Sequence, residues 1–181
     1  MSRLLEFSSL SERDRYLVSA ALDASRHAYA PYSGFAVGAA VRTRAGAIHA
    51  GANLENASYP VGTCAEVAAV TAANTAGEFD IEAIAVVGHK FTRPPDSAQV
   101  VTPCGRCRQV IFEASQVSSV DIEVLSCNGD LSQIVKTHIS ELLPSAFGPA
   151  NLGLDKVWSR MRDDLAARVH SLKAIVPKIA P

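Results

Sequence analysis

The sequence predicts an α/β fold, in which helices are layered on one central sheet. Strand-like segments alternate along the chain with helical segments, and this order is typical of helices packed on a sheet. The length of 181 residues lies in the usual range of one domain, and a chain of this size buries roughly 70% of its unfolded surface. Hydrophobic residues make up 48% of the chain and charged residues 19%, which indicates a folded protein rather than a disordered one.

The first helix is expected to begin at Ser11. Its hydroxyl can cap the first turn, while Asp14 completes a pair that resembles a capping box. The helix continues through residues 16–22 and should stop before Pro31. Residues 31–34, Pro-Tyr-Ser-Gly, are expected to form a turn, because Pro fixes φ and Gly admits a positive φ.

A hairpin is expected to follow this turn. Residues 35–43, Phe-Ala-Val-Gly-Ala-Ala-Val-Arg-Thr, have the pattern of a strand. Residues 44–46 turn the chain, so that residues 47–51 can pair back on the first strand.

The middle of the chain predicts a helix followed by a buried strand. Residues 65–74 form an alanine-rich helical segment, and Gly77 is a typical stop after its last turn. Residues 81–88 are too apolar for a strand with one face in water, so we expect a buried strand. Residues 89–101 contain two consecutive prolines and are expected to form a loop, longer than is typical of the family described below.

The remaining chain adds two helices and a strand. A helix is expected to begin at residues 103–104 and to continue through residues 110–114, followed by a strand over residues 120–125 and a turn at 128–130. Residues 154–175 have the pattern of an amphipathic helix, which Pro177 would close.

Charge and hydropathy exclude several classes of partner. The net charge is −1 and Lys and Arg are not clustered, so we do not expect binding to a nucleic acid polymer. No run of about 18 apolar residues exists to span a bilayer, so no membrane partner is expected. Residues 1–7 lack the apolar stretch of a signal peptide, which favours a cytoplasmic protein whose four cysteines are reduced.

Three of the cysteines are candidate metal ligands. Cys104 and Cys107 follow Pro103, a residue favoured at the first position of a helix, so both thiols should lie in one first turn. The amides and the positive dipole end there lower the pKa of a thiol and favour the metal-binding thiolate. Cys64 stands at the start of the preceding helix. Two helix N-termini that face each other would therefore offer three thiolates to one zinc ion.

A glutamate beside these cysteines suggests catalysis. Three protein ligands leave the fourth tetrahedral position for water, and Glu66 is close enough in sequence to Cys64 to exchange protons with that water. Cys-x-Glu together with Pro-Cys-x-x-Cys is the known signature of zinc deaminases. Two alternatives stay open: Cys104 and Cys107 are ordinary buried thiols, or Cys127 completes a structural Cys₄ site. We expect instead that Cys127 fills an apolar gap at a strand end.

Five segments resemble the small, zinc-dependent cytidine deaminases of the homotetrameric type. They follow one another in the order of that family and cover about residues 11–153: residues 30–40 (APYSGFAVGAA), 53–60 (NLENASYP), 64–66 (CAE), 103–109 (PCGRCRQ) and 141–149 (ELLPSAFGP). The resemblance implies a three-layer fold, with a mixed central sheet of about five strands and helices on both faces. It also implies a catalytic domain over residues 1–153, with residues 154–181 as a C-terminal helical extension.

The resemblance assigns roles at the reaction centre. It implies that Cys64, Cys104 and Cys107 hold one Zn²⁺ ion per subunit. It makes Glu66 the proton shuttle between the zinc-activated water and the cytosine ring. Ala65 would contribute backbone hydrogen bonds to the base.

The resemblance also assigns roles around the substrate. Phe35 matches the aromatic residue that packs on the pyrimidine, although it is also explained as a plain inward-facing strand residue. Asn53 and Glu55 match the pair that hydrogen-bonds the ribose, a role that suits an amide and a carboxylate; the alternative is a pair of polar turn residues. Because the family forms homotetramers with shared sites, Tyr59 and Phe147 are candidates to reach a neighbour's site, or else are core residues of their own subunit.

The sequence departs from the family at one functional position. Many members have Arg directly after the catalytic Glu, where it donates to the cysteine thiolates; here that residue is Val67. Three thiolates on Zn²⁺ leave a net charge of −1, which nearby donors must offset. We expect Arg106 to replace the missing arginine, with Arg108 as a second donor. The alternative is a solvated arginine on the helix face.

The expected reaction is hydrolytic deamination of cytidine and deoxycytidine to uridine and deoxyuridine, with release of ammonia, as in pyrimidine salvage. The Cys-Gly-Arg-Cys segment and the apolar residue after Cys-Ala-Glu also resemble blasticidin-S deaminases, so an unusual cytosine nucleoside is the alternative substrate. A deaminase of polynucleotides is disfavoured, because Cys64 stands where such enzymes commonly use His. A zinc-stabilised binding module without turnover is a third, non-enzymatic alternative.

Overall fold

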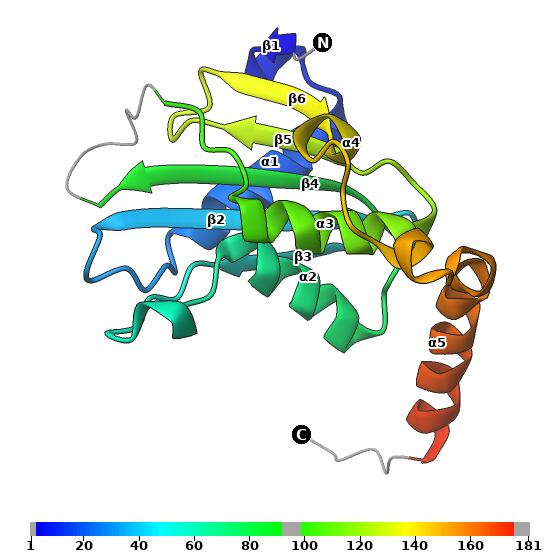
Figure 1. Ribbon diagram of the computed structural model, residues 1–181. Helices are drawn as coiled ribbons and strands as arrows, with labels where there is room; N and C mark the ends of the chain where they lie inside the picture. The colour runs from blue at the N-terminus through cyan, green and yellow to red at the C-terminus, as the bar shows by residue number, and fades with distance from the viewer. Residues whose placement is uncertain (1–2, 92–98, 176–181) are drawn as a thin grey trace.

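The computed structural model describes residues 3–91 and 99–175 and confirms the mixed α/β fold. One six-stranded sheet has the order β1-β6-β5-β4-β2-β3, in which only β4 and β5 pair in parallel (Figure 1). Its strands are β1 (Arg3–Leu5), β2 (Phe35–Thr43), β3 (Ile48–Ala52), β4 (Ile81–Lys90), β5 (Glu123–Cys127) and β6 (Ile134–His138).

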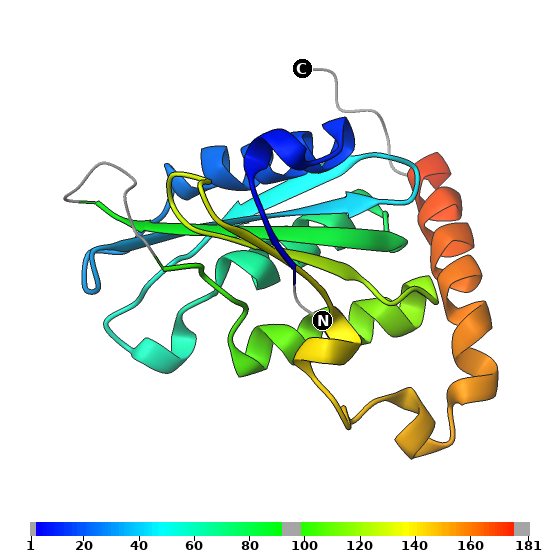
Figure 2. The same ribbon diagram turned by 90° about the horizontal axis from the view of Figure 1, so that it is seen from above.

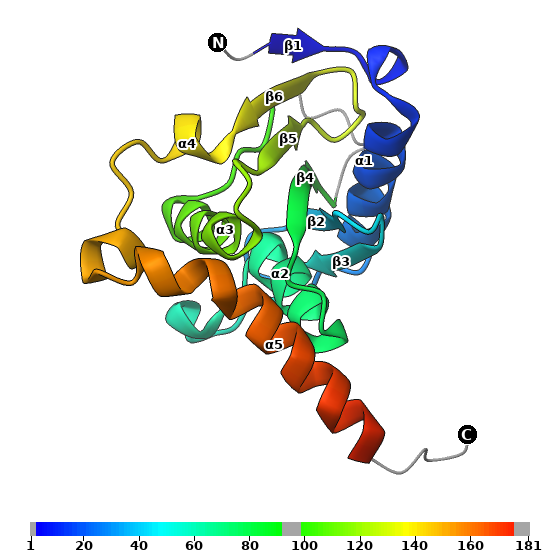
Figure 3. The same ribbon diagram turned by 90° about the vertical axis from the view of Figure 1, so that its right-hand side faces the viewer.

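Helices cover both faces of this sheet, as predicted. The helices are α1 (Glu12–Ser25), α2 (Ala65–Ala76), α3 (Gly105–Ser118), α4 (Ile139–Leu142) and α5 (Asp155–Ile175), with short 3₁₀ turns η1 (Phe7–Ser9), η2 (Tyr59–Val61) and η3 (Pro149–Leu152). Figure 3 shows α1 on one face, and α2 and α3 side by side on the other. Within the described residues, no helix combines the length and the hydropathy needed to cross a bilayer.

Small residues allow α1 to lie close against the sheet. A Cβ added at Gly38 of β2 would lie 2.0 Å from the backbone oxygen of Ala21 and 2.4 Å from the backbone nitrogen of Ser25, both in α1. Alanines on β2 and β4, such as Ala40 and Ala85, are fully buried under the same helix. The alanine- and glycine-rich sequence of these strands is therefore a packing requirement of the fold.

The ends of the first two long helices follow the sequence signals. Ser11 caps α1, because its hydroxyl accepts a hydrogen bond from the backbone N–H of Asp14 at 3.1 Å. The helix α2 ends at Gly77, which has a left-handed φ of 79°. Its amide bonds back to the carbonyl of Asn74, as a glycine C-terminal stop requires.

Several predicted boundaries are shifted. β4 continues to Lys90, so residues 89–90 of the expected loop belong to a strand, while its residues 92–98 lie outside the described residues. Pro103 precedes the N-cap of α3 instead of occupying its first position, because Cys104 is the N-cap. β5 begins only at Glu123, since Ser119 adopts a left-handed φ of 54° to end α3.

The long C-terminal helix α5 runs along the side of the molecule, across α2 and α3 (Figures 2 and 3). Near its start, Trp158 lines a cavity together with Phe112 of α3. Further along, Val169 lies against the end of α2, where its Cγ1 would be 2.6 Å from a Cβ at Gly77. The amphipathic helix predicted over residues 154–175 is thus present; Pro177, expected to close it, lies outside the described residues.

Candidate active site

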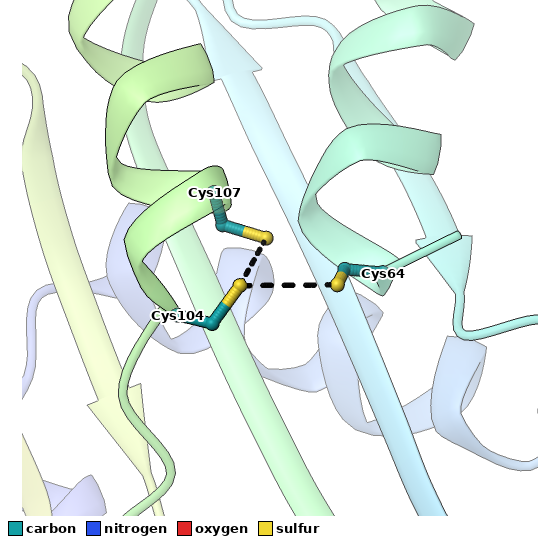
Figure 4. Close-up of side chains that lie close together, drawn as sticks. All are labelled: Cys64, Cys104 and Cys107. Carbon is teal, nitrogen blue, oxygen red and sulfur yellow. Dashed lines mark hydrogen bonds between the residues drawn. The ribbon is translucent and has the colours of Figure 1, made fainter. Parts of the chain in front are cut away.

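The N-terminal ends of α2 and α3 bring three cysteine sulfurs together. Cys64 is the N-cap of α2, Cys104 is the N-cap of α3, and Cys107 lies in the first turn of α3. The Sγ of Cys104 lies 4.0 Å from that of Cys64 and 3.4 Å from that of Cys107, and all three sulfurs are within 4.8 Å of one another (Figure 4). Among the described residues, this is the one such group of Cys, His, Asp and Glu side chains.

The three sulfurs fit a zinc ion. Tetrahedral zinc with Zn–S bonds of about 2.3 Å holds its sulfurs about 3.8 Å apart, between the separations of 3.4 Å and 4.0 Å from Cys104 to the other two sulfurs. Cys107 is buried, Cys64 is half-buried and Cys104 is exposed, so the cluster is open on one side. The pKa of Cys64 is lowered to about 6, chiefly by a hydrogen bond from Cys107, helped by Cys104 and by the charge of Arg106. Cys64 therefore favours the thiolate, the form that binds metal, whereas the hydrogen bond with Cys64 and burial raise the pKa of Cys107.

Glu66 lies in the first turn of α2, two residues beyond Cys64. Only 5% of its surface is exposed. Burial raises the pKa of this carboxyl, and the negative charge of the Cys64 sulfur raises it further. A carboxyl in such surroundings holds a proton more readily than a solvated one, which suits a group that must accept and return protons.

A cavity of about 580 Å³ opens in front of the cluster. Its wall contains eight of the residues singled out in the sequence: Asn53, Glu55, Tyr59, Cys64, Ala65, Glu66, Cys104 and Arg106.

The sequence did not reveal Val37, Val101 and Thr102, which also line this cavity. Val37 could have been found, because side chains two residues apart in a strand share a face and Phe35 had been singled out. Val101 and Thr102 stand in an irregular segment with no such pattern.

Two polar side chains of the cavity wall are held by the backbone around β2. The Asn53 amide accepts a hydrogen bond from the backbone N–H of Val37 at 2.8 Å and donates one to the carbonyl of Phe35 at 3.1 Å. Oε2 of Glu55 accepts hydrogen bonds from the backbone N–H groups of Tyr32 and Ser33. The contacts with Ser33 and Tyr32 lower the pKa of Glu55, so it is a carboxylate at neutral pH.

Three aromatic residues singled out in the sequence lie at or beyond the edge of this cavity. Phe35 is half-buried and is not part of the cavity wall; its ring lies over Gly88, where Cε1 would be 2.8 Å from a Cβ. Tyr59 is 67% exposed, and its ring centroid lies 6.2 Å from that of Tyr32. Phe147 is 60% exposed, and its carbonyl accepts a hydrogen bond from the Gln109 side chain at 2.8 Å.

The two arginines of the Cys-Gly-Arg-Cys-Arg segment point to different partners. Nη1 of Arg106 donates to the carbonyl of Gly62 at 3.2 Å, and its charge helps to lower the pKa of Cys64. Arg108 donates from Nε to the carbonyl of Pro103 at 2.8 Å and from Nη1 to that of Leu142 at 3.1 Å. Both hydrogen bonds of Arg108 thus go to backbone oxygens and not to sulfur.

Cys127 lies apart from the other cysteines. It is fully buried in the apolar cluster between the sheet and α1, whereas Ala65 and Ala69 of α2 belong to the cluster on the opposite face. Burial raises the pKa of Cys127 to about 12. These are the surroundings of an inert core thiol.

Comparison with known proteins finds deaminases by sequence and by structure. Residues 11–123 match the family model described as the cytidine and deoxycytidylate deaminase zinc-binding region. The chain is 41% identical over 131 residues to a cytidine deaminase of Halalkalibacterium halodurans, covering 72% of this chain and 91% of that one. It is 39% identical over 109 residues to a blasticidin-S deaminase of Bacillus cereus, covering 60% and 74%. The crystal structure of cytidine deaminase from Burkholderia pseudomallei matches 76% of this chain and all of that one, with a TM-score of 0.65 and 39% identity.

Proposed function

This chain belongs to the cytidine and deoxycytidylate deaminase family of hydrolytic deaminases, and we propose that it converts cytidine and deoxycytidine to uridine and deoxyuridine with release of ammonia, as in pyrimidine salvage. The observation that carries this proposal is that one cavity brings the candidate metal ligands and the candidate proton carrier together. Three converging cysteine sulfurs and a buried carboxyl with a raised pKa lie in or beside its wall.

Glu66 is the proton carrier of the proposed reaction. Cys64, Cys104 and Cys107 would hold the zinc ion, which supplies a Lewis acid that makes a water molecule acidic near neutral pH. Glu66 takes a proton from the attacking water and delivers it to N3 of the ring, which makes C4 electrophilic. It then passes the second proton of that water to the departing amine. The water oxygen is thus bonded to C4, the C4–N bond is broken, and ammonia leaves.

The rest of the cavity binds the nucleoside. Asn53 and Glu55 bind the ribose hydroxyls, since an amide can donate and accept hydrogen bonds while a carboxylate accepts them. Their bonds to the backbone fix both side chains before substrate arrives, which lowers the entropy cost of binding. Ala65 offers backbone groups to the base. Phe35 stands outside the wall of the cavity but over Gly88 beside Val101, which lines it, and is proposed to pack against the pyrimidine ring from there.

Arg106 is proposed to offset the charge of the thiolates. Three thiolates bring three negative charges to the metal site, and this chain has Val67 at the position where many members of the family are expected to carry an arginine. The guanidinium of Arg106 lies in the cavity wall and favours the thiolate form of Cys64. Its hydrogen bond to Gly62 holds it beside the cluster.

The active enzyme is proposed to be a homotetramer in which neighbouring subunits complete each site. Tyr59 and Phe147 support this, because both are large aromatic side chains left exposed in the single chain. Tyr59 lies in the cavity wall and Phe147 outside it. A neighbouring subunit would shield both rings from water.

A second candidate substrate is a modified cytosine nucleoside such as blasticidin S. The observation in its favour is the cation of Arg106 in the cavity wall, within the Cys-Gly-Arg-Cys segment that resembles blasticidin-S deaminases. The 39% identity to such an enzyme agrees with this candidate.

One experiment separates these functions. The purified zinc-loaded protein is incubated with cytidine, deoxycytidine, 5-methylcytidine, cytosine, adenosine, guanine and blasticidin S, and ammonia release is measured. We expect turnover of cytidine and deoxycytidine above all others. Glu66→Gln should lower kcat by roughly 10²–10⁴-fold or more while zinc remains bound, because it removes the proton carrier. Turnover only with blasticidin S favours the second candidate, and no turnover with any compound contradicts both.

A further inference from the structure

Arg108 follows the proposed ligand Cys107 directly in the sequence. Its side chain nevertheless bonds to two backbone carbonyls, those of Pro103 and Leu142, and not to a sulfur. We propose that Arg108 is a positioning residue, which fixes Cys104 by fastening the segment before α3 to α4 through Pro103 and Leu142. The inference rests on the metal site proposed above. It assigns Arg108 a mechanical role in place of the expected electrostatic one.

Cys104 is the ligand that most needs such support. It is exposed and, as N-cap, lies outside the helix proper with extended backbone angles (φ −68°, ψ 169°) and no capping bond from its side chain. Cys107, in contrast, is buried within the first turn. Arg108 holds the backbone on both sides of Cys104: its amide N–H donates to the carbonyl of Cys104 at 2.9 Å, and its Nε donates to that of Pro103 at 2.8 Å.

The other end of this contact is itself rigid. The amide of Ile139 at the start of α4 donates to the carbonyl of Ile122, and the Ile139 side chain is buried. The next residue, Ser140, is bonded to the carboxylate of Asp121 through its amide at 3.1 Å and its hydroxyl at 2.6 Å. Leu142 therefore offers its carbonyl from a fixed turn, and Arg108 transmits that fixed position to the segment before Cys104.

The two bonds of Arg108 require a planar, forked side chain. Nε and Nη1 donate to carbonyls that belong to different segments of the chain, at residues 103 and 142. A lysine carries the same charge on one compact ammonium group and cannot reproduce this fork. A positioning role and an electrostatic role therefore predict different outcomes for Arg108→Lys.

The test measures zinc affinity by competition with a chelator, in the full-length holoprotein of the wild type, Arg108→Lys and Arg108→Met. We expect both variants to bind zinc about 10- to 100-fold more weakly than the wild type, as is typical when a residue that orients a metal ligand is lost. Because zinc binding is measured without substrate, this result is independent of the proposed deamination. A protein that turns over no nucleoside but shows these affinities would retain the positioning role and lose the proposed function.

Arg44→Lys is the matched control. Nη2 of Arg44 donates to the carbonyl of Ser118 at 3.0 Å, so this arginine supports the opposite end of α3 by the same kind of bond. We expect Arg44→Lys to lower the Tm but to leave zinc affinity within about twofold of the wild type, since no ligand lies at that end.

Three outcomes would overturn the proposal: zinc affinity unchanged in both Arg108 variants, affinity kept by Arg108→Lys and lost only in Arg108→Met, or losses no larger than that of Arg44→Lys. If Arg108→Lys does not fold, Arg108→Gln takes its place. Its shorter planar amide can still donate to Pro103 but does not reach Leu142, so we expect an intermediate loss of zinc affinity; wild-type affinity in that variant would also refute the proposal.

Discussion

The four cysteines of this chain differ in their surroundings more than in their sequence. Cys64 and Cys104 cap helices and line a cavity, and hydrogen bonds lower the pKa of Cys64. Cys127 is enclosed by apolar side chains that disfavour any charge. The pKa of these thiols is thus set by hydrogen bonding and burial rather than by residue type.

This difference predicts that Cys127→Ser keeps zinc. The hydroxyl would be buried in an apolar cluster, so we expect a loss of about 1–3 kcal/mol in the free energy of unfolding and an unchanged metal content. Elemental analysis of the dialysed protein and urea unfolding measure the two effects. Loss of the metal would mean that Cys127 is a fourth ligand and that the site is closed.

Arg106→Ala tests whether Arg106 compensates the charge of the thiolates without contributing to the stability of the fold. Without the guanidinium, the thiolates keep more negative charge and the bond to Gly62 is lost, so we expect kcat to fall about tenfold or more. The Tm should change little, because the side chain is exposed. Steady-state kinetics and thermal unfolding check both expectations; an unchanged kcat would contradict the compensating role.

At the scale of single elements, β2 and α1 approach each other closely at Gly38. Gly38→Ala would place a methyl group 2.0 Å from the backbone oxygen of Ala21, where no rotamer change can relieve the overlap. We expect a loss of about 3 kcal/mol in the free energy of unfolding, measured by urea denaturation.

Gly105→Ala is the control for that substitution. A Cβ at Gly105 meets nothing within 4 Å, and the residue opens α3. Its free energy of unfolding should stay equal to that of the wild type or rise slightly, because alanine is the better helix former. Equal losses in the two variants would show that steric overlap is not the cause.

The sequence predicted the elements that carry strong local signals. The strand over 35–43 and the helix that ends at Gly77 were correct, since alternation, alanine content and the glycine stop act within a few residues. The strand β1 was missed because three residues are too few to show a pattern. The strand β6 was missed as well; both owe their conformation to pairing, β1 with β6 and β6 also with β5.

The candidate site also combines residues that could be predicted from the sequence with contacts that could not. Cys64, Glu66, Cys104 and Cys107 form motifs that are readable from the chain, and the structure brings the three sulfurs together. The contacts of Arg108 could not be predicted, because its partner Leu142 lies 34 residues away and is a backbone carbonyl, which no residue type reveals.

At the scale of the whole molecule, a buried charge network joins elements that are far apart in the sequence. Asp14 of α1 accepts hydrogen bonds from Arg42 of β2 at 2.9 Å and from Lys136 of β6 at 3.3 Å, and Arg42 also bonds to Glu82 of β4 at 2.6 Å. Burial raises the pKa of Asp14, but Arg42 and Lys136 outweigh this effect, so the pKa lies below its ordinary value. Asp14 therefore stabilises the fold through this network while its carboxyl is ionised.

The lowered pKa of Asp14 determines how the stability of the fold depends on pH. A carboxyl whose pKa is lower in the folded state stabilises the protein above about pH 4, its unfolded pKa, and this contribution disappears as the pH falls through the folded pKa. Asp14→Asn should cost about 1.5–3 kcal/mol at pH 7, because Arg42 and Lys136 lose a charged partner while Arg42 keeps Glu82, and should show a flatter acid dependence than the wild type. Urea unfolding between pH 7 and the acid range measures both.

Asp23→Asn provides the comparison for this prediction. Asp23 pairs with Arg26 at 2.9 Å, but both side chains are about two-thirds exposed. Its loss should change the free energy of unfolding by less than about 1 kcal/mol. If Asp14→Asn behaved like Asp23→Asn, the buried network would contribute nothing to stability.

We also propose that residues 1–153 form the catalytic domain and that residues 154–181 are an extension. Removing the extension should leave zinc binding and deamination intact, but should lower the Tm, because Leu165 and Val169 would no longer cover apolar surface of α2 and α3. Metal analysis, kinetics and thermal unfolding of the shortened chain are the measurements. Loss of zinc or of activity would place the extension within the catalytic domain.

The position of Trp158 has a consequence for spectroscopy. It is the single tryptophan of the chain, it lies on α5, and it faces Phe112 of α3 across a cavity remote from the cysteine cluster. The four tyrosines all lie in the first third of the sequence. Indole emission is therefore a built-in optical probe of whether α5 is seated on α3, and its time course during denaturation can be compared with loss of sheet ellipticity to learn which part of the molecule comes apart first.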